Sequence, residues 1–132
     1  MGQLADAIVG MVKGDTTLNA LIDGRIYPAT VPQEKALPAV TYQVISTLRT
    51  ISKDGDTGIR SYRVQFNILG KNTQVLADIA DGLLELFHIF YPTISNGVRI
   101  LVAHAEDTEE DDYEPDVNVY VKRMDFRIKT SH

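Results

Sequence analysis

The stretch SYRVQFNIL at residues 61–69 decides the fold, because its side chains alternate between polar and apolar from Ser61 to Ile68. The apolar positions are Tyr62, Val64, Phe66 and Ile68, and the polar positions between them are Arg63, Gln65 and Asn67. A period of two residues is that of a β-strand with one buried face. The stretch therefore predicts a strand over 61–69 whose apolar side chains face a core.

A second periodic stretch follows at once and predicts the main helix, over about 73–88. Its apolar residues recur three and four positions apart, at Val75, Leu76, Ile79, Ala80, Leu83, Leu84 and Phe87. This spacing gathers them in one stripe along a helix. Asn72 or Thr73 precedes the stripe and is suited to cap the helix. We expect this helix to lie on the apolar face of the sheet.

The residues before 61 predict a hairpin partner for the first strand. Over 39–47, Val40, Tyr42 and Val44 alternate with polar residues. The stretch from 53 to 58 is rich in Gly and Asp, which favour turns. We therefore expect a long hairpin whose Gly-rich tip, over 48–60, projects beyond the domain.

Two more strands are predicted towards the C-terminus, over 98–104 and 117–129. In the second, the apolar residues occupy odd positions up to Val121 and even positions from Met124 onwards. A bulge near Lys122 and Arg123 would restore a single inward face. Alternatively, the second half of this strand packs on a neighbouring subunit.

The N-terminal third predicts two helices, over 3–13 and 16–22, with Asp15 as the cap of the second. Residues 25–28 favour an extended conformation, and a crossing loop follows that is punctuated by prolines. Together the elements predict an α+β fold, with a mainly antiparallel sheet and a long hairpin packed against the main helix and the N-terminal helix. The length of 132 residues favours one domain over 1–132.

Charge is distributed unevenly along the chain. The formal net charge is −5, yet residues 106–116 hold eight acids and no base. The remainder has ten acids and thirteen bases, and is therefore basic by three charges (13 − 10). We interpret the acidic segment as a solvated loop. The net charge argues against broad nucleic-acid affinity, and no apolar run reaches the ~20 residues that span a bilayer.

A search for catalytic chemistry finds no convincing site. The acids at 109–112 are predicted in a loop, which gives no rigid separation of an acid from a base. His88, His104 and His132 lack the spacing of metal ligands, the chain has no cysteine, and the nucleotide-binding glycine motifs are absent. We therefore expect that the protein binds no cofactor and is not an enzyme. A small metal-dependent hydrolase that uses the acidic segment is the weakest alternative.

The chain resembles the small phage tail-completion proteins, which include tail terminators and tail-to-head joining proteins of long-tailed phages. The resemblance is carried by six short stretches in a particular order. They are residues 17–21 (TLNAL), 24–28 (GRIYP), 31–33 (VPQ), 37–42 (LPAVTY), 62–66 (YRVQF) and 77–81 (ADIAD). The last third of the chain contributes least.

The resemblance implies a structural virion protein at the head–tail interface, assembled in the host cytoplasm. Its implied partners are further copies of itself in a hexameric ring, the tail tube protein and the head–tail connector protein. The ring would cap the tail tube and join it to the connector. The alternative within the same context is a head-completion adaptor on the portal side.

Two sets of residues are candidates for these contacts. The hairpin tip would form a subunit or tube interface through Arg49, Lys53, Asp54, Asp56 and Arg60. The acidic segment, repeated around a ring, would line a channel with Glu109, Glu110, Asp111 and Asp112, so that DNA passes without specific binding. An outer solvated loop is an equally good interpretation of these acids.

Overall fold

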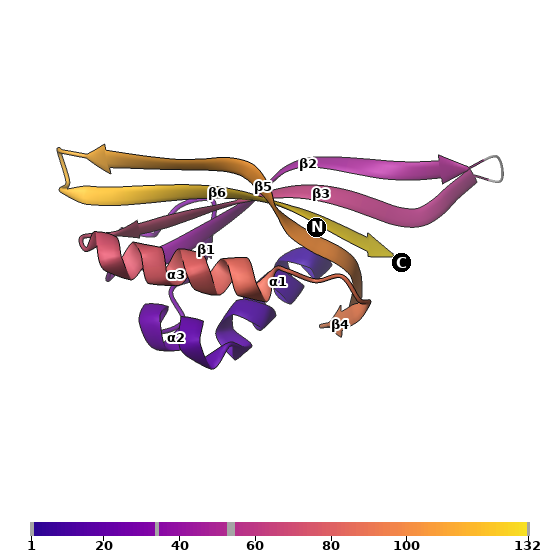
Figure 1. Ribbon diagram of the computed structural model, residues 1–132, viewed down its shortest axis with the longest axis horizontal. Coiled ribbons are helices and arrows are strands. Elements are labelled where there is room, and N and C mark those ends of the chain that lie inside the picture. Colours follow the sequence, from indigo (N-terminus) through magenta and orange to yellow (C-terminus); the bar gives the residue numbers. More distant parts are fainter. Residues whose placement is uncertain (1, 34, 53–54, 132) are drawn as a thin grey trace.

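The computed structural model describes residues 2–33, 35–52 and 55–131. In this part of the chain, three helices lie on one face of a six-stranded sheet (Figure 1). We call that face the helix-covered face and the opposite one the helix-free face. The expected α+β fold with a mainly antiparallel sheet is confirmed.

The elements follow one another in an order close to the predicted one. The helices are α1 (Gly2–Gly14), α2 (Thr16–Ile22) and α3 (Thr73–Leu86). The strands are β1 (Ile26–Pro28), β2 (Ala39–Ser52), β3 (Gly55–Gly70), β4 (Thr93–Ser95), β5 (Val98–Glu114) and β6 (Val119–Ser131). The short β4 was not predicted.

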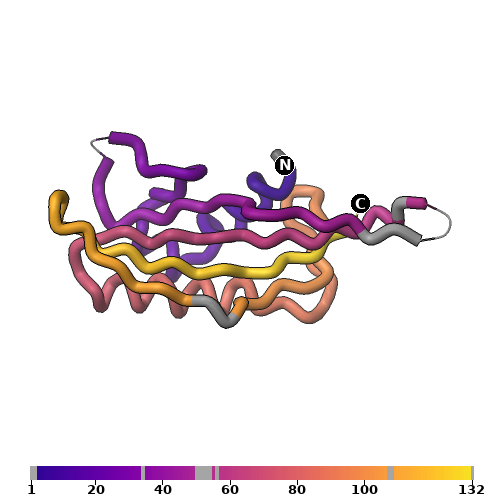
Figure 2. Tube along the Cα trace, turned by 90° about the horizontal axis from the view of Figure 1, so that it is seen from above, coloured from indigo at the N-terminus to yellow at the C-terminus, as the bar shows by residue number. Residues whose placement is uncertain are grey.

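The last strand in the sequence lies in the middle of the sheet. The strand order is β1-β2-β3-β6-β5-β4, and Figure 2 shows β6 between β3 and β5. Neighbouring strands are antiparallel except for β1 and β2, which are parallel. β6 is therefore stabilised along both edges, and it joins the two hairpins into one sheet.

The core lies between the helices and the helix-covered face. Its centre is a trio of fully buried rings, Phe66 of β3, Phe87 at the end of α3 and Phe126 of β6. Their centroids are 5.3, 5.4 and 5.8 Å apart. These distances are typical of favourable aromatic pairs, so the trio fixes α3 against the two central strands.

Two predicted helix caps are present. Asp15 Oδ1 accepts a hydrogen bond from Leu18 N at 3.0 Å, which caps α2. Asn72, and not Thr73, caps α3, because its Oδ1 accepts hydrogen bonds from the backbone nitrogens of Gln74 and Val75 at 2.9 and 3.3 Å. Each cap satisfies backbone donors that the first helical turn leaves without an acceptor.

The β2–β3 hairpin is longer than predicted. β2 continues to Ser52 and β3 begins at Gly55, so the segment 55–58 belongs to a strand and not to a loop. Gly55 and Gly58 have φ angles of 110° and 78°, which glycine adopts without strain. We call the outer part of this hairpin, residues 49–52 and 55–60, the arm. It extends beyond the end of β6, whose Ser131 pairs with Ile59 (Figure 1).

The prediction of an acidic loop over 106–116 is wrong for most of the segment. β5 continues to Glu114, and Glu109 to Glu114 pair in register with Met124 to Val119 of β6. Sequence reasoning favoured a loop because a run of carboxylates repels itself. In the structure, basic side chains of β6 stand opposite the acids and offset that repulsion.

The predicted bulge near Lys122 and Arg123 is absent, and the register of β3 and β6 is unbroken through these residues. Instead, the buried apolar side chains of β6 change from one face of the sheet to the other along the strand. Met124 is buried on the helix-covered face, whereas Val121 is buried on the helix-free face. Val121 lines the same hollow as Ala29 to Val31, so the crossing loop shields it from solvent.

Candidate assembly surfaces

The acidic part of β5 forms a ladder of ion pairs with the start of β6. Lys122 Nζ lies 2.5 Å from Glu109 Oε1 and 3.0 Å from Asp111 Oδ1. The hydrogen bond from Lys122 to Glu109 raises the pKa of Lys122 above its ordinary value, against the opposing effect of burial. The alternate acids on the same strand turn to the other face, where Arg123 Nη1 lies 3.9 Å from Glu110 and 3.7 Å from Asp112.

A second ionic cluster lies on the helix-free face of the central strands. The Asp125 carboxylate is buried, and it accepts hydrogen bonds from Arg63 Nη2 at 2.6 Å and from Gln65 Nε2 at 3.2 Å. The bond to Asp125 raises the pKa of the Arg63 guanidinium. Arg127 Nε donates to Glu106 Oε1 at 3.0 Å nearby. These pairs tie β3, β6 and β5 together across the face that carries no helix.

The four acids predicted to line a channel are thus distributed over both faces of one strand. Glu109 and Asp111 share a cation on one face, and Glu110 and Asp112 share another on the opposite face. A carboxylate that is hydrogen-bonded to a cation is poorly placed to bind a metal ion as well. Among the described residues, no three His, Asp or Glu side chains are grouped so that they could hold a metal ion.

The arm brings together some of the residues predicted for an interface. Arg49 and Arg60 occupy directly opposed positions of β2 and β3, and Arg49 is exposed. Arg60 Nη1 donates to the Ile59 carbonyl at 3.2 Å. Asp56 stands opposite Ile51 in the backbone register, whereas Lys53 and Asp54 lie outside the described residues.

The arm and the acidic hairpin leave the molecule at opposite ends. Figure 1 shows the β2–β3 hairpin pointing one way along the long axis and the β5–β6 hairpin pointing the other way. The two ends also differ in charge, because the arm bears Arg49 and Arg60 with one acid, Asp56, whereas residues 106–114 bear seven acids and no Lys or Arg. The two predicted contact regions therefore cannot meet within one subunit.

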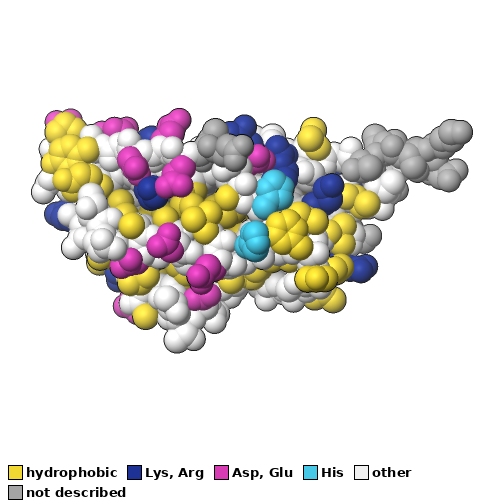
Figure 3. Space-filling view, viewed as in Figure 1, with side chains coloured by type: hydrophobic (Ala, Val, Ile, Leu, Met, Phe, Trp, Pro, Cys, Tyr) yellow, Lys and Arg dark blue, Asp and Glu magenta, His cyan; other side chains and the backbone are white. Residues whose placement is uncertain are grey.

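An exposed apolar patch follows α3 and was not predicted. It consists of Phe90, Tyr91 and Ile94, whose exposed fractions are 56%, 83% and 72%. The ring of His88 stands edge-on to Phe90, with centroids 4.6 Å apart. Figure 3 shows hydrophobic side chains gathered beside histidines on this part of the surface. The crowding of aromatic residues over 87–91 was the available signal in the sequence.

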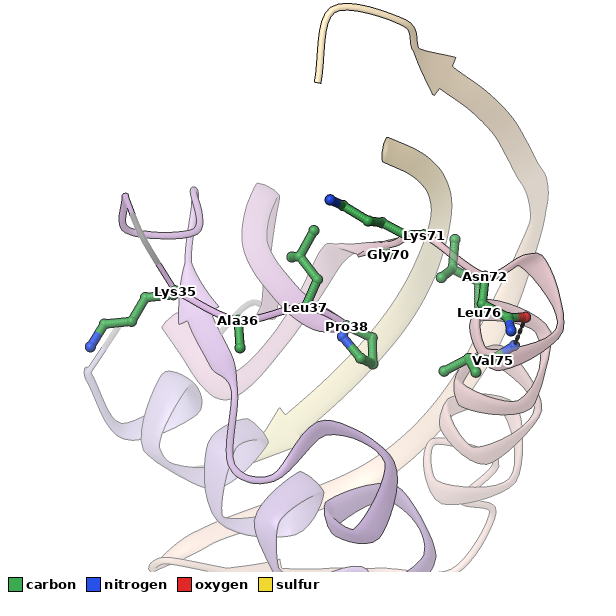
Figure 4. A pocket seen from close by; sticks show the side chains of 9 residues that line it. All are labelled: Lys35, Ala36, Leu37, Pro38, Gly70, Lys71, Asn72, Val75 and Leu76. Atoms are coloured by element: carbon green, nitrogen blue, oxygen red, sulfur yellow. Dashed lines mark hydrogen bonds between the residues drawn. The ribbon is translucent and has the colours of Figure 1, made fainter. Parts of the chain in front are cut away.

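A shallow hollow of about 460 Å³ lies between the crossing loop and the start of α3. Leu37, Pro38 and Leu76 give it an apolar lining, and Lys35 and Lys71 add charge (Figure 4). The Asn72 side chain is engaged in capping α3 and does not serve a ligand there. The hollow therefore offers contact area and no convergent set of reactive groups. No helix in the described part of the chain is both long and apolar enough to cross a membrane.

Comparison with solved structures shows that the fold is a known one. A chain from a structure titled "Virion of native gene transfer agent (GTA) particle" superposes with a TM-score of 0.80 at 14% identity, over 99% of this chain and 96% of that chain. A second solved chain gives a TM-score of 0.56 at 14% identity, over 99% and 92% of the two chains. At such identities the likeness concerns the fold alone.

Comparison of sequences identifies the family. No curated protein matches the sequence at a significant level. The model of the family described as tail completion protein gp17, however, matches residues 6–131. This match covers almost the whole chain, including the last third, where the resemblance of short stretches was weakest. The chain therefore belongs to the tail completion protein gp17 family and has a structural role in completing a phage tail.

Proposed function

We propose that this protein is the subunit of a ring that caps the tail tube and joins it to the head connector. The observation that carries the proposal is the pair of unlike ends on one elongated sheet, seen in a member of a tail-completion family. A subunit that offers different surfaces at its two ends associates head to tail, and such contacts form a ring when the rotation closes. The virion origin of the GTA chain with the same fold supports a place in the particle.

The arm is the proposed contact with a neighbouring subunit or with the tube. Its outer part, beyond the pair of Ile59 with Ser131, extends past the end of β6, where it can approach another chain. We assign this role to Arg49 and Arg60, together with Lys53, Asp54 and Asp56 of the same hairpin. Arg49→Glu should weaken association of the subunits, whereas Lys129→Glu, at an exposed position of β6, should not. Sedimentation at equal protein concentration compares the two variants.

The acidic part of β5 is the proposed lining of the channel. Residues 106–114 contain seven acids, and the ion pairs described for this segment involve three cations, Lys122, Arg123 and Arg127, so the segment keeps an excess of negative charge. A negative lining repels the DNA backbone and lets it slide without binding. An electron-microscopy map of the ring tests this, because acids found on the outer rim would contradict it.

Deletion of the gene distinguishes this function from a head-completion adaptor on the portal side. Loss of a tail-capping ring should give overlong or unjoined tails beside filled heads, whereas loss of an adaptor should give heads that leak DNA. Particle images of the purified protein mixed with tail tubes provide a direct test. Rings seated at tube ends are expected, and a protein that never binds a tube would refute the proposal.

A further inference from the structure

The sheet has two backbone edges that its own strands leave uncovered. Among the described strands, β1 pairs with β2 at Val40 to Tyr42 and no strand covers the outer edge of β2 from Gln43 onwards. β4 pairs with β5 at Val98 to Ile100, and Ile89 forms a further bridge to Ala103. Within the described residues, no strand lies on β5 beyond that bridge. Such edges present unpaired backbone groups that another strand can use.

The two open edges differ in the number of charged side chains that protect them from association. Over 104–114, β5 carries seven acids and neither Lys nor Arg, and charge is a common protection of an edge strand. Over 43–52, β2 carries a single charged residue, Arg49, beside aliphatic side chains. Ile45 and Leu48 are 46% and 61% exposed. The edge of β2 thus lacks the protection that the edge of β5 has, as expected of a strand that is covered in the assembled state.

We infer that the open edge of β2 in one subunit pairs with the acidic open edge of β5 in the next subunit, so that the sheet continues from copy to copy. This inference rests on the proposed ring and specifies the contact that builds it. In the order β2-β3-β6-β5 each strand is antiparallel to its neighbour. Repetition of the sheet in the same orientation therefore makes the new pair antiparallel, as every pair in these two hairpins is.

The positions of the short strands fix the stagger between copies. β1 covers β2 at the end from which the acidic hairpin extends, and β4 covers β5 at the end of the arm (Figures 1 and 2). The open part of β2 and the open part of β5 therefore lie at opposite ends of the molecule. They meet only if the neighbour is displaced along the strands, and a displacement of this kind also closes a sheet into a ring.

Charge selects this pairing over the two symmetric ones. If two β5 edges met, seven acids would face seven acids, and like charges directly opposite each other destabilise a sheet. If two β2 edges met, a closed dimer would form and both acidic edges would stay uncovered. When β2 meets β5, the exposed Arg49 approaches the carboxylates that outnumber their cations on β5. This arrangement alone uses both edges and can extend to a ring.

Cysteine cross-linking tests the pairing, because the chain contains no cysteine of its own. Leu48 and Glu110 both face the helix-free side, since Leu48 stands opposite Ser61 of β3 and Glu110 contacts Arg123. We would make Leu48→Cys and Glu110→Cys as separate variants and oxidise them singly and as a mixture with diamide. Ser46→Cys and Asp112→Cys each lie two residues from the first pair, on the same strand and the same face. Each β2 variant is mixed with each β5 variant, and the four mixtures cover neighbouring registers.

The expected result is a disulfide-linked dimer in at least one β2–β5 mixture and none in any single variant. Glu110→Cys mixed with Leu84→Cys, a partly exposed position on α3, is the matched control and should not cross-link. Circular dichroism and the melting temperature of each variant show that it is folded. A double variant that carries both cysteines of a cross-linking mixture should give a ladder of covalent oligomers.

Each other outcome overturns the inference in a recognisable way. A dimer from Leu48→Cys alone would show that two β2 edges pair with each other. Rings visible in the electron microscope, without cross-linking in any of the four combinations, would refute edge pairing and leave the proposed function intact. A folded protein that forms neither rings nor cross-links, even with tail tubes present, would refute both.

Discussion

The two faces of the sheet are held by different forces. On the helix-covered face, Phe66 and Phe126 have no exposed surface, and α3 packs directly on them. On the helix-free face, Asp125, Arg63 and Gln65 form a hydrogen-bonded group across two strands. The first face owes its stability to buried apolar area, and the second to pairs of polar groups. The helix-free face is therefore ordered by hydrogen bonds and ion pairs, without a helix packed on it.

The largest effect should come from the helix-covered face. Phe126→Ala removes one ring of the trio and leaves a cavity, which should lower the free energy of unfolding by about 3–5 kcal/mol. Urea denaturation followed by circular dichroism measures this loss. Lys129→Ala, at an exposed position on the same strand, serves as the control and should change little. A loss below about 1 kcal/mol for Phe126→Ala would mean that the core lies elsewhere.

A smaller effect is expected at the centre of the helix-free face. Arg63→Met removes the charged partner of the buried Asp125 and leaves Gln65 as a donor to that carboxylate. Because the Arg63 side chain is 38% exposed, solvent screens part of the loss, and we expect a loss of stability clearly smaller than that of Phe126→Ala. Urea denaturation of the two variants measures the difference.

A double-mutant cycle isolates this pair. Arg63→Met combined with Asp125→Asn should cost less than the sum of the two single changes, because neither residue then leaves the other as an unpaired charge. Strict additivity of the two changes would show that the pair contributes nothing, and it would remove the contrast between the faces at this position.

Lys122 should give an effect of about 1 kcal/mol that depends on pH. Its pKa is raised in the folded protein by the bond to Glu109, so protonation favours folding. The contribution is fully present below the ordinary lysine pKa of about 10.4 and is lost as the pH rises through the raised value. The difference in unfolding free energy between the wild type and Lys122→Met should therefore be constant from neutral pH to about pH 10 and shrink above it.

Comparison with the variant also cancels the effect of Tyr42, whose pKa is raised by burial and by Asp6. Tyr42 is present in both proteins, so its own loss of stability at high pH subtracts out. The difference in unfolding free energy between the two proteins should shrink by pH 11, which is about half a unit above the ordinary lysine pKa. If it stays constant beyond that pH, the assigned role of Glu109 is contradicted.

The smallest effect is expected at Arg123. Its guanidinium lies 3.7 and 3.9 Å from two exposed carboxylates, and pairs of this kind contribute about 0–1 kcal/mol. Arg123→Ala should therefore change stability by less than Arg63→Met does. Added salt should reduce the remaining difference, because the ions screen exposed charges. A change as large as that of Arg63→Met would show that the outer ladder matters as much as the buried cluster.

The parts of the fold that sequence predicted are those whose signal is local. The alternation at 61–69 and the stripe after Asn72 each specify one element, and the burial of Phe66 and Ile79 follows from them. The acidic strand was missed because its stability comes from Lys122 and Arg123. These two residues lie on the partner strand of the hairpin, outside the acidic stretch itself. Carboxylates have a low preference for strands, so their own pattern indicated a loop.

The candidate surfaces were predicted less well than the fold, for a related reason. The position of Arg49 and Arg60 on one projecting hairpin followed from the turn-rich residues between two alternating strands. The open edges of β2 and β5 did not, because they depend on the short lengths of β1 and β4. Three-residue strands carry too little periodicity to be recognised. The exposed patch at Phe90 and Tyr91 was hidden because aromatic residues beside a helix usually belong to the core.

The central place of β6 has a consequence for the protein during its synthesis. Arg63 and Asp125, which meet across β3 and β6, are 62 positions apart in the chain. On the ribosome, β3 and β5 emerge before the strand that separates them, and synthesis proceeds at about 5–20 residues per second. During this interval each strand has an edge that β6 will later occupy. Until β6 is made, these two edges can pair with strands of other chains.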